Sequence, residues 1–410
     1  MKKEEFTFKK IELKEKRVFR DAIHNYIHVD DHVILQLINS SAMQRLKRIK
    51  QLGATHQVYQ SAEHSRFTHS LGVYAVVRRM LKESEIGDYL SEYDQLTVMV
   101  AGLLHDIGHG PFSHCFENIW GICHEDYTVK MIQEDKEIHS ILENCVERLS
   151  HDVCAIIKKT HPRQILVQMI SSQLDCDRMD YLLRDSYFTG TTYGHFDLSR
   201  ILRVMQVKNG KIVYKKSGVQ AIENYILARY HMYWQVYYHP ATRSYEQIMI
   251  SLFQRTKDLY IQGYDFKDMR YLIHFFENKV SIEDYMKLDE NICFYYFRLL
   301  SESDDPILSD LASRLLNRQL FVYEDFVSNQ QKIDIEQKCQ EHGYDPRYYV
   351  FMDDQIQIPY LHYGKSEDIR EIEIIQNDQF VPLSEVSEIV GAIIQSNHNK
   401  SDSKIYYPLF

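Results

Sequence analysis

The sequence has no uncharged apolar run long enough to cross a membrane, and its cysteines are not paired at metal-binding spacing. No apolar stretch follows the first residues, so we expect no secretory signal. The seven cysteines are an odd number and are best interpreted as reduced thiols. Repeats, low-complexity tracts and flexible linkers are also missing. Together these absences predict a cytoplasmic protein whose parts pack against one another.

Positive charge is in deficit, because 48 Lys and Arg stand against 58 Asp and Glu, a net charge of −10. Broad binding to a nucleic-acid duplex needs a basic surface that displaces counterions, so we expect no such partner. Residues 44–50 are locally basic, and this pattern fits a binding site and a solvated helix face about equally. Tyrosine is abundant, with 30 residues, and we expect several of them to line pockets.

Helical periodicity dominates the pattern along the chain. Residues 6–30 are extended and turn-like, residues 33–260 carry mostly helical periodicity, and helices continue to about residue 317 around a turn at 301–306. Alternation at 355–361 and 371–375 predicts strands, and residues 384–388 predict a capped helix start. We therefore predict a mainly α protein with a helical core, residues 1–325, and a small α+β C-terminal lobe, residues 326–410.

The clearest functional signal lies in residues 101–114, where an apolar helical run ends abruptly in His105, Asp106, His109 and His114. Burying an unpaired carboxylate is costly, and a bound cation is one of the few partners that offsets this cost. Such a conflict between the local pattern and its polar content is where function is expected.

Two further residues, His69 and Asp177, complete a candidate metal site with His105 and Asp106. Two imidazoles and two carboxylates suit Mn, Fe, Zn or Mg, and on an octahedral ion they leave about two positions for water and substrate. Asp177 lies in an acidic run, so its neighbours are alternatives for the fourth ligand. We expect one of them, Asp180, to support a ligand instead.

Four separated stretches, residues 44–53, 63–72, 104–114 and 177–185, resemble the HD-domain deoxynucleoside triphosphate (dNTP) triphosphohydrolases. The similarity runs from residue 18 to residue 245 and is greatest to the Firmicute-type relatives of the vertebrate enzyme, whose additional SAM domain has no counterpart here. It implies a helical HD-domain core with a divalent metal at His69, His105, Asp106 and Asp177. It also implies that Mg accompanies the triphosphate.

The resemblance implies hydrolysis of a dNTP to a deoxynucleoside and inorganic triphosphate. Catalytic roles fall on His109, His114, Glu117, His124 and Glu125, with His114 as general acid and Glu117 polarising it. The vertebrate relative has Asp at the position of Glu117, so the side chain here is one methylene longer.

The resemblance also implies the substrate contacts. Arg66, Arg178 and Arg229 would bind phosphate, Gln51 and Asp185 the 3′ hydroxyl, and Leu52 and Tyr237 would crowd the 2′ carbon. Tyr181 shares a helical face with Arg178, which replaces a lysine of the vertebrate relative. Tyr238 would lie at the base, where that relative has glutamine.

Regulation is implied as well, because relatives bind activating nucleotides between subunits. The matching positions here are Arg17, Val18, Asn39, Gln44, Lys47, Arg200 and Lys215, while Pro240 replaces a lysine. We expect a homo-oligomer, a tetramer rather than a dimer, that is activated by a dNTP or GTP with altered base preference.

Other functions stay open from the sequence. One is an HD phosphohydrolase for nucleoside monophosphates, cyclic dinucleotides or guanosine tetraphosphate. The guanosine tetraphosphate hydrolases have Glu-Asp soon after the His-Asp pair, where this chain has Ile-Gly-His-Gly, and the Gly-Tyr-Pro element of the cyclic-dinucleotide class is missing. Another is a nucleotide sensor with little turnover, although all four candidate ligands are present. A nuclease is a third, which the net charge disfavours.

Overall fold

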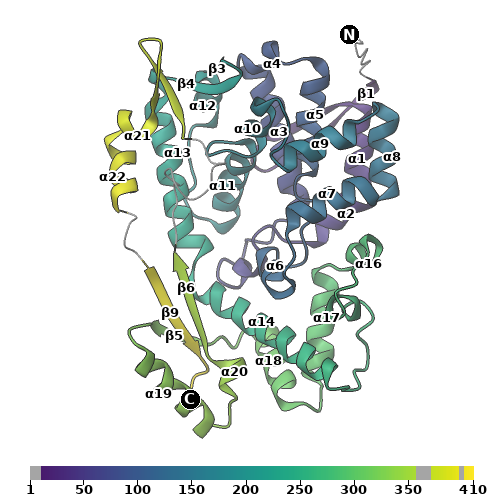
Figure 1. Ribbon diagram of the computed structural model, residues 1–410, viewed down its shortest axis with the longest axis vertical. Helices are drawn as coiled ribbons and strands as arrows, with labels where there is room; N and C mark the ends of the chain where they lie inside the picture. Colours follow the sequence, from purple (N-terminus) through teal and green to yellow (C-terminus); the bar gives the residue numbers. More distant parts are fainter. Residues whose placement is uncertain (1–10, 357–370, 397–400) are drawn as a thin grey trace.

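The fold comes from a computed structural model that describes residues 11–356, 371–396 and 401–410. Helices make up most of these residues, which confirms the mainly α prediction (Figure 1). The start of the predicted N-terminal extended segment, residues 6–10, and most of the predicted strand at 355–361 lie outside the described residues.

The elements up to the middle of the chain are β1 (Glu12–Asp21), β2 (Asn25–Asp31), α1 (His32–Asn39), α2 (Ser41–Arg45), η1 (Leu46–Arg48), η2 (Gly53–Gln57), α3 (Arg66–Glu83), α4 (Ile86–Tyr89), α5 (Glu92–Leu104), α6 (His114–Trp120), α7 (His124–Glu134), α8 (Lys136–Cys145), α9 (Leu149–Ile157), α10 (Gln164–Ile170), α11 (Cys176–Thr189) and α12 (Leu198–Val204).

The remaining elements are β3 (Met205–Lys208), β4 (Lys211–Lys215), η3 (Lys216–Gly218), α13 (Val219–Met232), the π-helical turn η4 (Tyr233–Tyr237), α14 (Pro240–Ile261), α15 (Ile273–Phe276), α16 (Ile282–Lys287), α17 (Glu290–Ser301), α18 (Pro306–Asn317), β5 (Val322–Asp325), α19 (Asn329–Glu341), α20 (Pro346–Tyr349), β6 (Phe351–Ile356), β7 (Glu373–Gln376), β8 (Gln379–Pro382), α21 (Leu383–Val386), α22 (Glu388–Ser396) and β9 (Ser401–Tyr407).

Three helices, α3, α5 and α11, form the centre of the core. A capping box of Ser91 and Asp94 starts α5, which then buries every residue from Leu96 to its end at Leu104. Helix α3 packs against both α5 and α11. It approaches α11 so closely at Gly72 that an added Cβ would lie 1.9 Å from Oδ1 of Asp180. The glycine therefore sets the spacing between the two helices that carry His69 and Asp177.

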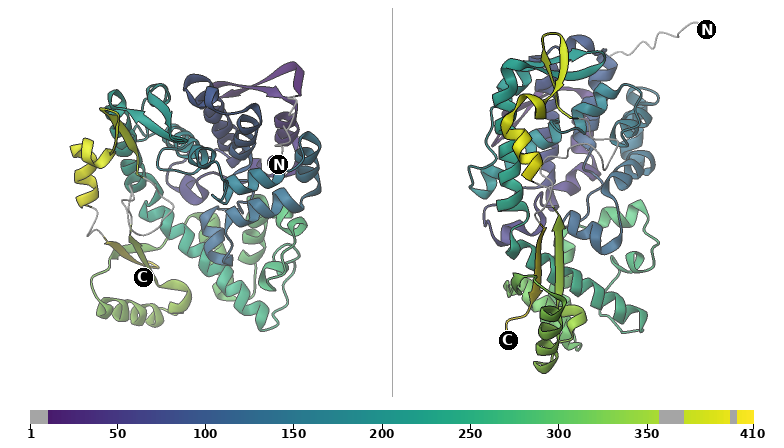
Figure 2. Two further views of the ribbon diagram at one scale, coloured as in Figure 1. Left: turned by 45° about the horizontal axis from the view of Figure 1, so that its top comes forward. Right: turned by 60° about the vertical axis from the view of Figure 1, so that its left-hand side comes forward.

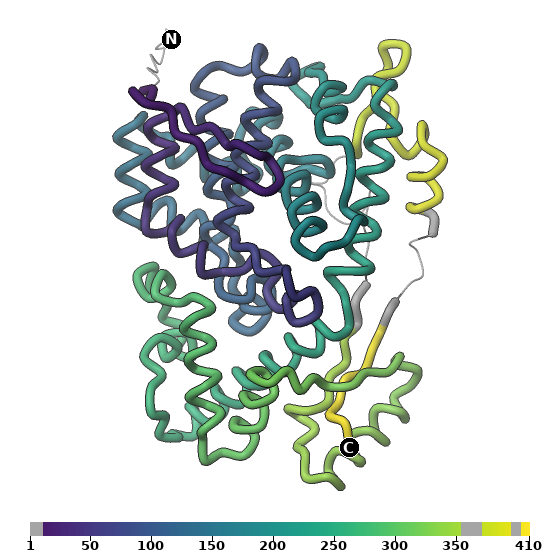
Figure 3. The backbone as a smooth tube through the Cα atoms, turned by 180° about the vertical axis from the view of Figure 1, so that it is seen from behind, coloured from purple at the N-terminus to yellow at the C-terminus, as the bar shows by residue number. Residues whose placement is uncertain are grey.

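The hairpin of β1 and β2 lies across the back of this core (Figure 3). Its antiparallel register pairs Arg17 with Val29 and Asp21 with Asn25. Ile27 and Val29 bury their side chains inward, and β2 packs against α1 and α3. The extended reading of this part of the chain is confirmed.

The mostly helical segment of residues 33–260 also contains an antiparallel hairpin of β3 and β4, which the sequence analysis did not predict. Its turn is Asn209-Gly210, and both residues have positive φ, as a two-residue hairpin turn requires. Strand β4 then pairs in parallel with β7, so that Tyr214 lies beside Ile374. The predicted strand at 371–375 is therefore confirmed as β7, but it joins a sheet on the helical core.

The C-terminal part of the chain thus divides between two places (Figures 1 and 2). A three-stranded sheet in the order β5-β9-β6 forms a small lobe with α19 and α20. Residues 373–396 lie instead beside β4 and α13, and Ser387 caps the helix predicted there by accepting a hydrogen bond from the backbone of Val390. The division at residue 325 stays a prediction.

No helix within the described ranges is both long and apolar enough to span a bilayer.

Candidate active site

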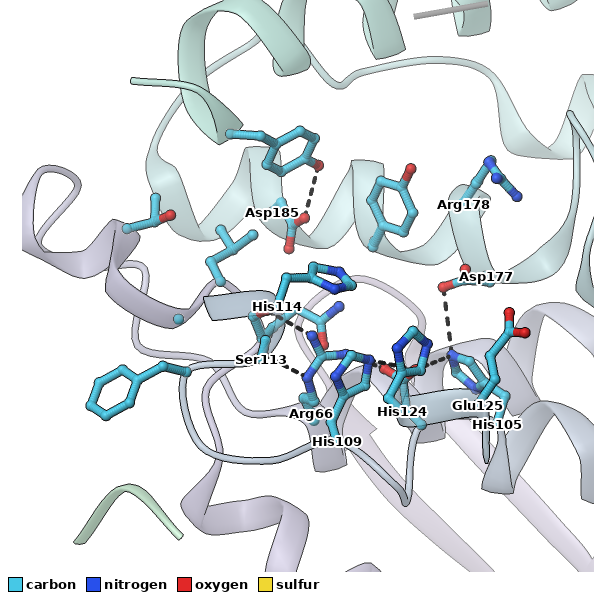
Figure 4. A pocket seen from close by; sticks show the side chains of 18 of the residues that line it. Arg66, His105, His109, Ser113, His114, His124, Glu125, Asp177, Arg178 and Asp185 are labelled. Atoms are coloured by element: carbon cyan, nitrogen blue, oxygen red, sulfur yellow. Dashed lines mark hydrogen bonds and ion pairs between the residues drawn. The ribbon is translucent and has the colours of Figure 1, made fainter. Parts of the chain in front are cut away.

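A cavity of about 570 Å³ opens where the central helices end. Its walls come from the start of α3, the loop after α5, the starts of α6, α7 and α11, the residues after α9, and the π-helical turn η4. Figure 4 shows Arg66, His109, His114 and His124 on one wall, with Asp185 facing them and Arg178 and Glu125 toward the opposite end. The volume is typical of a small-molecule site.

His69, on the first turn of α3, is fully buried behind the cavity wall. Its Nδ1 donates to Asp180 Oδ2 over 2.8 Å, and its Nε2 lies 3.0 Å from Asp177 Oδ1. Burial alone would lower the pKa of His69, but the hydrogen bonds with Asp177 and Asp180 raise it to about 10. The expected support of a ligand candidate by Asp180 is confirmed, and the converging carboxylates favour a cation at this point.

His105 and Asp106 follow directly after the last residue of α5, which lets adjacent side chains reach one point. His105 Nδ1 donates to the Gly102 carbonyl over 2.9 Å, so Nε2 keeps its lone pair. That Nε2 is buried and has no hydrogen-bond partner among the described residues. It lies 3.2 Å from Asp106 Oδ1 and 3.5 Å from Asp177 Oδ1.

The donor set fits a divalent metal. Ligand atoms of His69, His105 and Asp106 lie within 4.8 Å of one another, and Asp177 Oδ1 lies beside both imidazoles. Burial alone would raise the pKa of Asp177, but the adjacent imidazoles of His105 and His69 hold it well below its usual range. Two imidazoles and two carboxylates suit Mn, Fe, Zn or Mg, and the metal displaces the imidazole protons when it binds.

Arg66 is the buried cation beside this set, with 3% of its surface exposed. Its guanidinium pairs with Asp106, and its Nε donates to Ser113 Oγ over 2.9 Å. Ser113 has a φ of 53°, and its neighbour Phe112 has a φ of 58°. Strained backbone of this kind gathers at functional sites, where the surrounding structure holds it in place.

Three histidines surround Glu117 beside the metal candidates. Glu117 Oε1 lies 2.9 Å from His124 Nδ1, 3.2 Å from His114 Nδ1 and 3.3 Å from His109 Nδ1. Burial would raise the pKa of Glu117, but these imidazoles lower it strongly. Burial and the charge of Arg66 lower the pKa of His109 to about 3, so this ring is neutral. His114 is 72% exposed and borders the cavity, where it can meet a substrate.

The residues expected to bind sugar and base all line the cavity. Tyr237 donates to Asp185 Oδ2 over 2.8 Å, and Gln51, Leu52 and Tyr238 line the same space. The π-helical turn η4 brings Tyr237 to this wall, and such turns are frequent at functional sites. The sequence patterns do not reveal that turn.

The residues expected to bind phosphate divide into two groups. Arg66 and Arg178 line the cavity, as does Tyr181 on the same face as Arg178, whereas Arg229 does not. Arg229 is buried behind Tyr233, with its guanidinium 5.7 Å from that ring centre and hydrogen-bonded to Gln173. Its predicted contact with phosphate therefore stays a prediction.

The expected regulatory residues lie outside this cavity. Arg17, Val18 and Lys47 are exposed, and Gln44 donates to the Ile38 carbonyl. Asn39 borders a separate hollow between α1 and α8. Arg200 donates to the Ser217 carbonyl, two residues beyond Lys215 on the chain.

The basic stretch at 44–50 is no continuous charged surface. Arg45 is 1% exposed, with its guanidinium on the carbonyls of His109 and Leu288. Arg48 pairs with Asp289. Neither the binding-site reading nor the solvated-face reading describes Arg45, which instead holds the loop that carries His109.

Several residues of the site carry no signal that the sequence reasoning used. His24 donates to Asp180 Oδ1 over 2.6 Å, and Arg184 joins Asp180 to Asp21, so the β1–β2 hairpin reaches the metal candidates. Lys159 borders the cavity and pairs with Glu125. Apart from the pair of Asp180 and Arg184, which are four residues apart on α11, these contacts join residues that are far apart in the chain, and one sequence alone does not reveal them.

The chain is similar to known protein families over most of its length. Residues 66–185 match the HD domain, and residues 196–409 match the HD associated region. The chain is 45% identical over 406 residues to the protein YwfO of Bacillus subtilis, covering 97% of this chain and 93% of that protein. It is 28% identical over 355 residues to the deoxynucleoside triphosphate triphosphohydrolase SAMHD1 of Homo sapiens, covering 75% of this chain but only 54% of that protein.

A solved structure is similar over nearly the whole chain. A phosphohydrolase from Bacteroides thetaiotaomicron has a TM-score of 0.85 and 29% sequence identity, covering 96% of this chain and all of that one.

Proposed function

The chain belongs to the HD-domain phosphohydrolase family, and from this premise we propose that it hydrolyses dNTPs to deoxynucleosides and inorganic triphosphate. The observation that supports the proposal most strongly is a single cavity beside the candidate metal ligands. One end of this cavity offers groups that suit a sugar, and the other offers cations that suit phosphates. Asp185 and Tyr237 lie at one end, Arg178 at the other, and His114 with Arg66 between them (Figure 4). A nucleotide with its sugar at the first end directs its phosphates toward the cations.

A divalent metal held by His69, His105, Asp106 and Asp177 would supply Lewis-acid chemistry and a nucleophilic water. Arg66 is fixed by Asp106 and Ser113, so its charge stabilises the negative charge on the phosphate that reacts. His114 donates its proton to the 5′ oxygen that leaves, which keeps the triphosphate intact. Glu117 orients His114, and His109 stays neutral and packs beside them.

Selection for deoxyribose follows from the crowded wall around the sugar. The Tyr237 hydroxyl is bound to Asp185, which fixes the ring, and Leu52 faces the same space. A 2′ hydroxyl has to displace one of these groups. Tyr238, in place of an amide, offers the base a ring face and a single hydroxyl, so we expect broad tolerance of the base.

We further propose a cytoplasmic homo-oligomer, a tetramer rather than a dimer, activated by a dNTP or GTP. The supporting observation is that the candidate regulatory residues lie outside the cavity and that Arg17, Val18 and Lys47 are exposed. An activator acts only through tighter binding to the active state. Lys47 offers charge without the planar fork of arginine, which weakens strict selection of the activator's base.

The test is to measure rate against substrate for each dNTP alone and in pairs, with light scattering alongside. We expect turnover of dNTPs that exceeds turnover of ribonucleoside triphosphates, and a rise in both rate and mass when a second dNTP is added. The Asp177→Ala variant should lose bound metal and turnover, since three ligands hold the ion poorly. Asp126→Ala, an exposed acid on α7, is its matched control and should behave as wild type.

Turnover of cyclic dinucleotides or guanosine tetraphosphate in place of dNTPs would contradict the proposed substrate. Hyperbolic kinetics in every combination, with constant mass, would contradict the proposed activation.

A further inference from the structure

Lys159 follows the end of α9 and lines the cavity without belonging to any motif in the sequence. Its Nζ lies 3.0 Å from Oε1 of Glu125, which borders the same end of the cavity as Arg178 (Figure 4). Both side chains of this pair are partly exposed, at 36% and 41%, so solvent and a ligand can reach them.

The backbone of Lys159 has a conformation that is uncommon for a residue with a side chain. Its φ is 62°, and it occupies the left-handed position that ends a helix, with its N–H bonded to Ile156 and that of Thr160 to Ala155. Glycine is the usual residue at such a position, because a Cβ strains the backbone there. Here the chain tolerates the strain and keeps a cationic side chain that points to the cavity. An observed outlier of this kind points to a role for the side chain.

Position at a helix end also gives Lys159 a simpler structural role. A lysine near the carboxyl end of a helix also stabilises the helix dipole. That role, however, is equally available to Lys158, which is exposed and does not line the cavity. Of these two lysines, Lys159 alone combines the helix end with the cavity wall and an acidic partner from another helix.

We propose that Lys159, held by Glu125, binds the terminal phosphate of the substrate and so selects a triphosphate tail over shorter ones. The inference rests on the proposed function, because it places the sugar at Asp185 and the phosphates toward Arg178. In this arrangement Arg178 and Lys159 contact successive parts of the tail. Glu125 then acts as a positioning residue for Lys159 rather than as a proton carrier.

The test uses two probes that need no turnover, inorganic tripolyphosphate and pyrophosphate, titrated calorimetrically into the metal-loaded protein. Lys159→Gly should weaken binding of tripolyphosphate about 10- to 100-fold, the range of a charge-assisted hydrogen bond, and that of pyrophosphate much less. The same variant should be at least as stable to heat as wild type, because glycine relieves the strained backbone.

Two further variants complete the design. Lys159→Arg keeps the charge and should restore most of the selectivity, and Lys158→Met removes a neighbouring charge and should bind both probes as wild type. The ratio of kcat/KM for a dNTP to that for the diphosphate should fall in Lys159→Gly in the same proportion.

Equal weakening of both probes in Lys159→Gly, or no weakening of either, would overturn the inference. If tripolyphosphate binds through Lys159 while no dNTP is hydrolysed, the inference stands and the proposed function fails. If dNTPs are hydrolysed while Lys159→Gly keeps its selectivity, the proposed function stands and the inference fails.

Discussion

The pKa values of single residues in this protein depend on the balance between burial and neighbouring polar or charged groups. Glu290 is the clearest case with a consequence for pH dependence. It begins α17, is 3% exposed, and accepts backbone hydrogen bonds from Lys50 over 2.9 Å and Phe112 over 3.3 Å. Burial outweighs these hydrogen bonds and raises its pKa to about 7. Glu290 therefore supports the loop before Ser113 through hydrogen bonds, but its ionised form destabilises the folded state.

The sign of the effect follows from the raised pKa. The unfolded chain releases this proton near the model-peptide pKa, roughly 4.3, and the folded chain near 7, so the contribution to stability is present below the first value and lost as pH rises through the second. We expect the free energy of unfolding of wild type, relative to Glu290→Gln, to fall by on the order of 3 kcal/mol between pH 5 and pH 8.

Chemical unfolding of both proteins at the two pH values measures this difference. Glu302→Gln, at the exposed far end of α17, is the matched control and should show no such change. A difference between wild type and Glu290→Gln that stays constant with pH would show that Glu290 ionises freely in the fold.

The sequence singled out the metal candidates because an apolar helix that ends in His105 and Asp106 breaks its own pattern, and the structure brings these candidates together. It also pointed to Asp180 as support for a ligand. It did not reveal His24, because its partner Asp180 lies 156 residues away and a hydrogen bond over that separation leaves no local pattern. Arg184 lies four residues after Asp180 on the same helix, and this pair was missed although its spacing allows it.

At the scale of elements, the β1–β2 hairpin is the part of the fold that reaches the metal site from outside the core. Asp21 binds Arg184 and the backbone of the turn, and His24 donates to the same Asp180 that holds His69. The hairpin therefore fixes the orientation of a candidate ligand through one shared carboxylate.

Removing that link should loosen the metal site without unfolding the core. We expect His24→Phe, which keeps a ring but no donor, to lower metal affinity about 10- to 100-fold, the usual effect of losing a residue that orients a ligand. The measurement is a competition titration against a chelator, with circular dichroism to follow the helices.

His28→Phe is the control, because His28 lies on the same hairpin with an exposed side chain. Wild-type affinity in His24→Phe would mean that the hairpin plays no part in positioning His69.

The sequence predicted some secondary-structure elements and missed others. Long periodic helices such as α3 and α5 were predicted, but the β3–β4 hairpin was missed although its Asn209-Gly210 turn is a strong signal. Strand β7 was predicted, yet its pairing with β4 joins segments about 160 residues apart, and no local pattern specifies such a partner.

At the scale of the whole molecule, the fold brings four distant segments to one cavity. Helix α3 supplies Arg66, the loop after α5 supplies His105 and Asp106, α11 supplies Asp177, and the turn after α13 supplies Tyr237. The lobe of β5, β6 and β9 also reaches it, because Asp353 of β6 binds Arg243, which lines the cavity with Glu246. The sequence predicted the existence of a C-terminal lobe but not this contact.

The most direct test of the account is the identity of the products formed from a dNTP in ¹⁸O-labelled water. If His114 protonates the 5′ oxygen, water attacks the first phosphorus, and the products are unlabelled deoxynucleoside and inorganic triphosphate that carries the label. Loss of the proton donor in His114→Gln should slow this reaction by about 10²–10⁴ without changing the products. Formation of deoxynucleoside monophosphate and pyrophosphate, or of diphosphate and phosphate, would contradict the account.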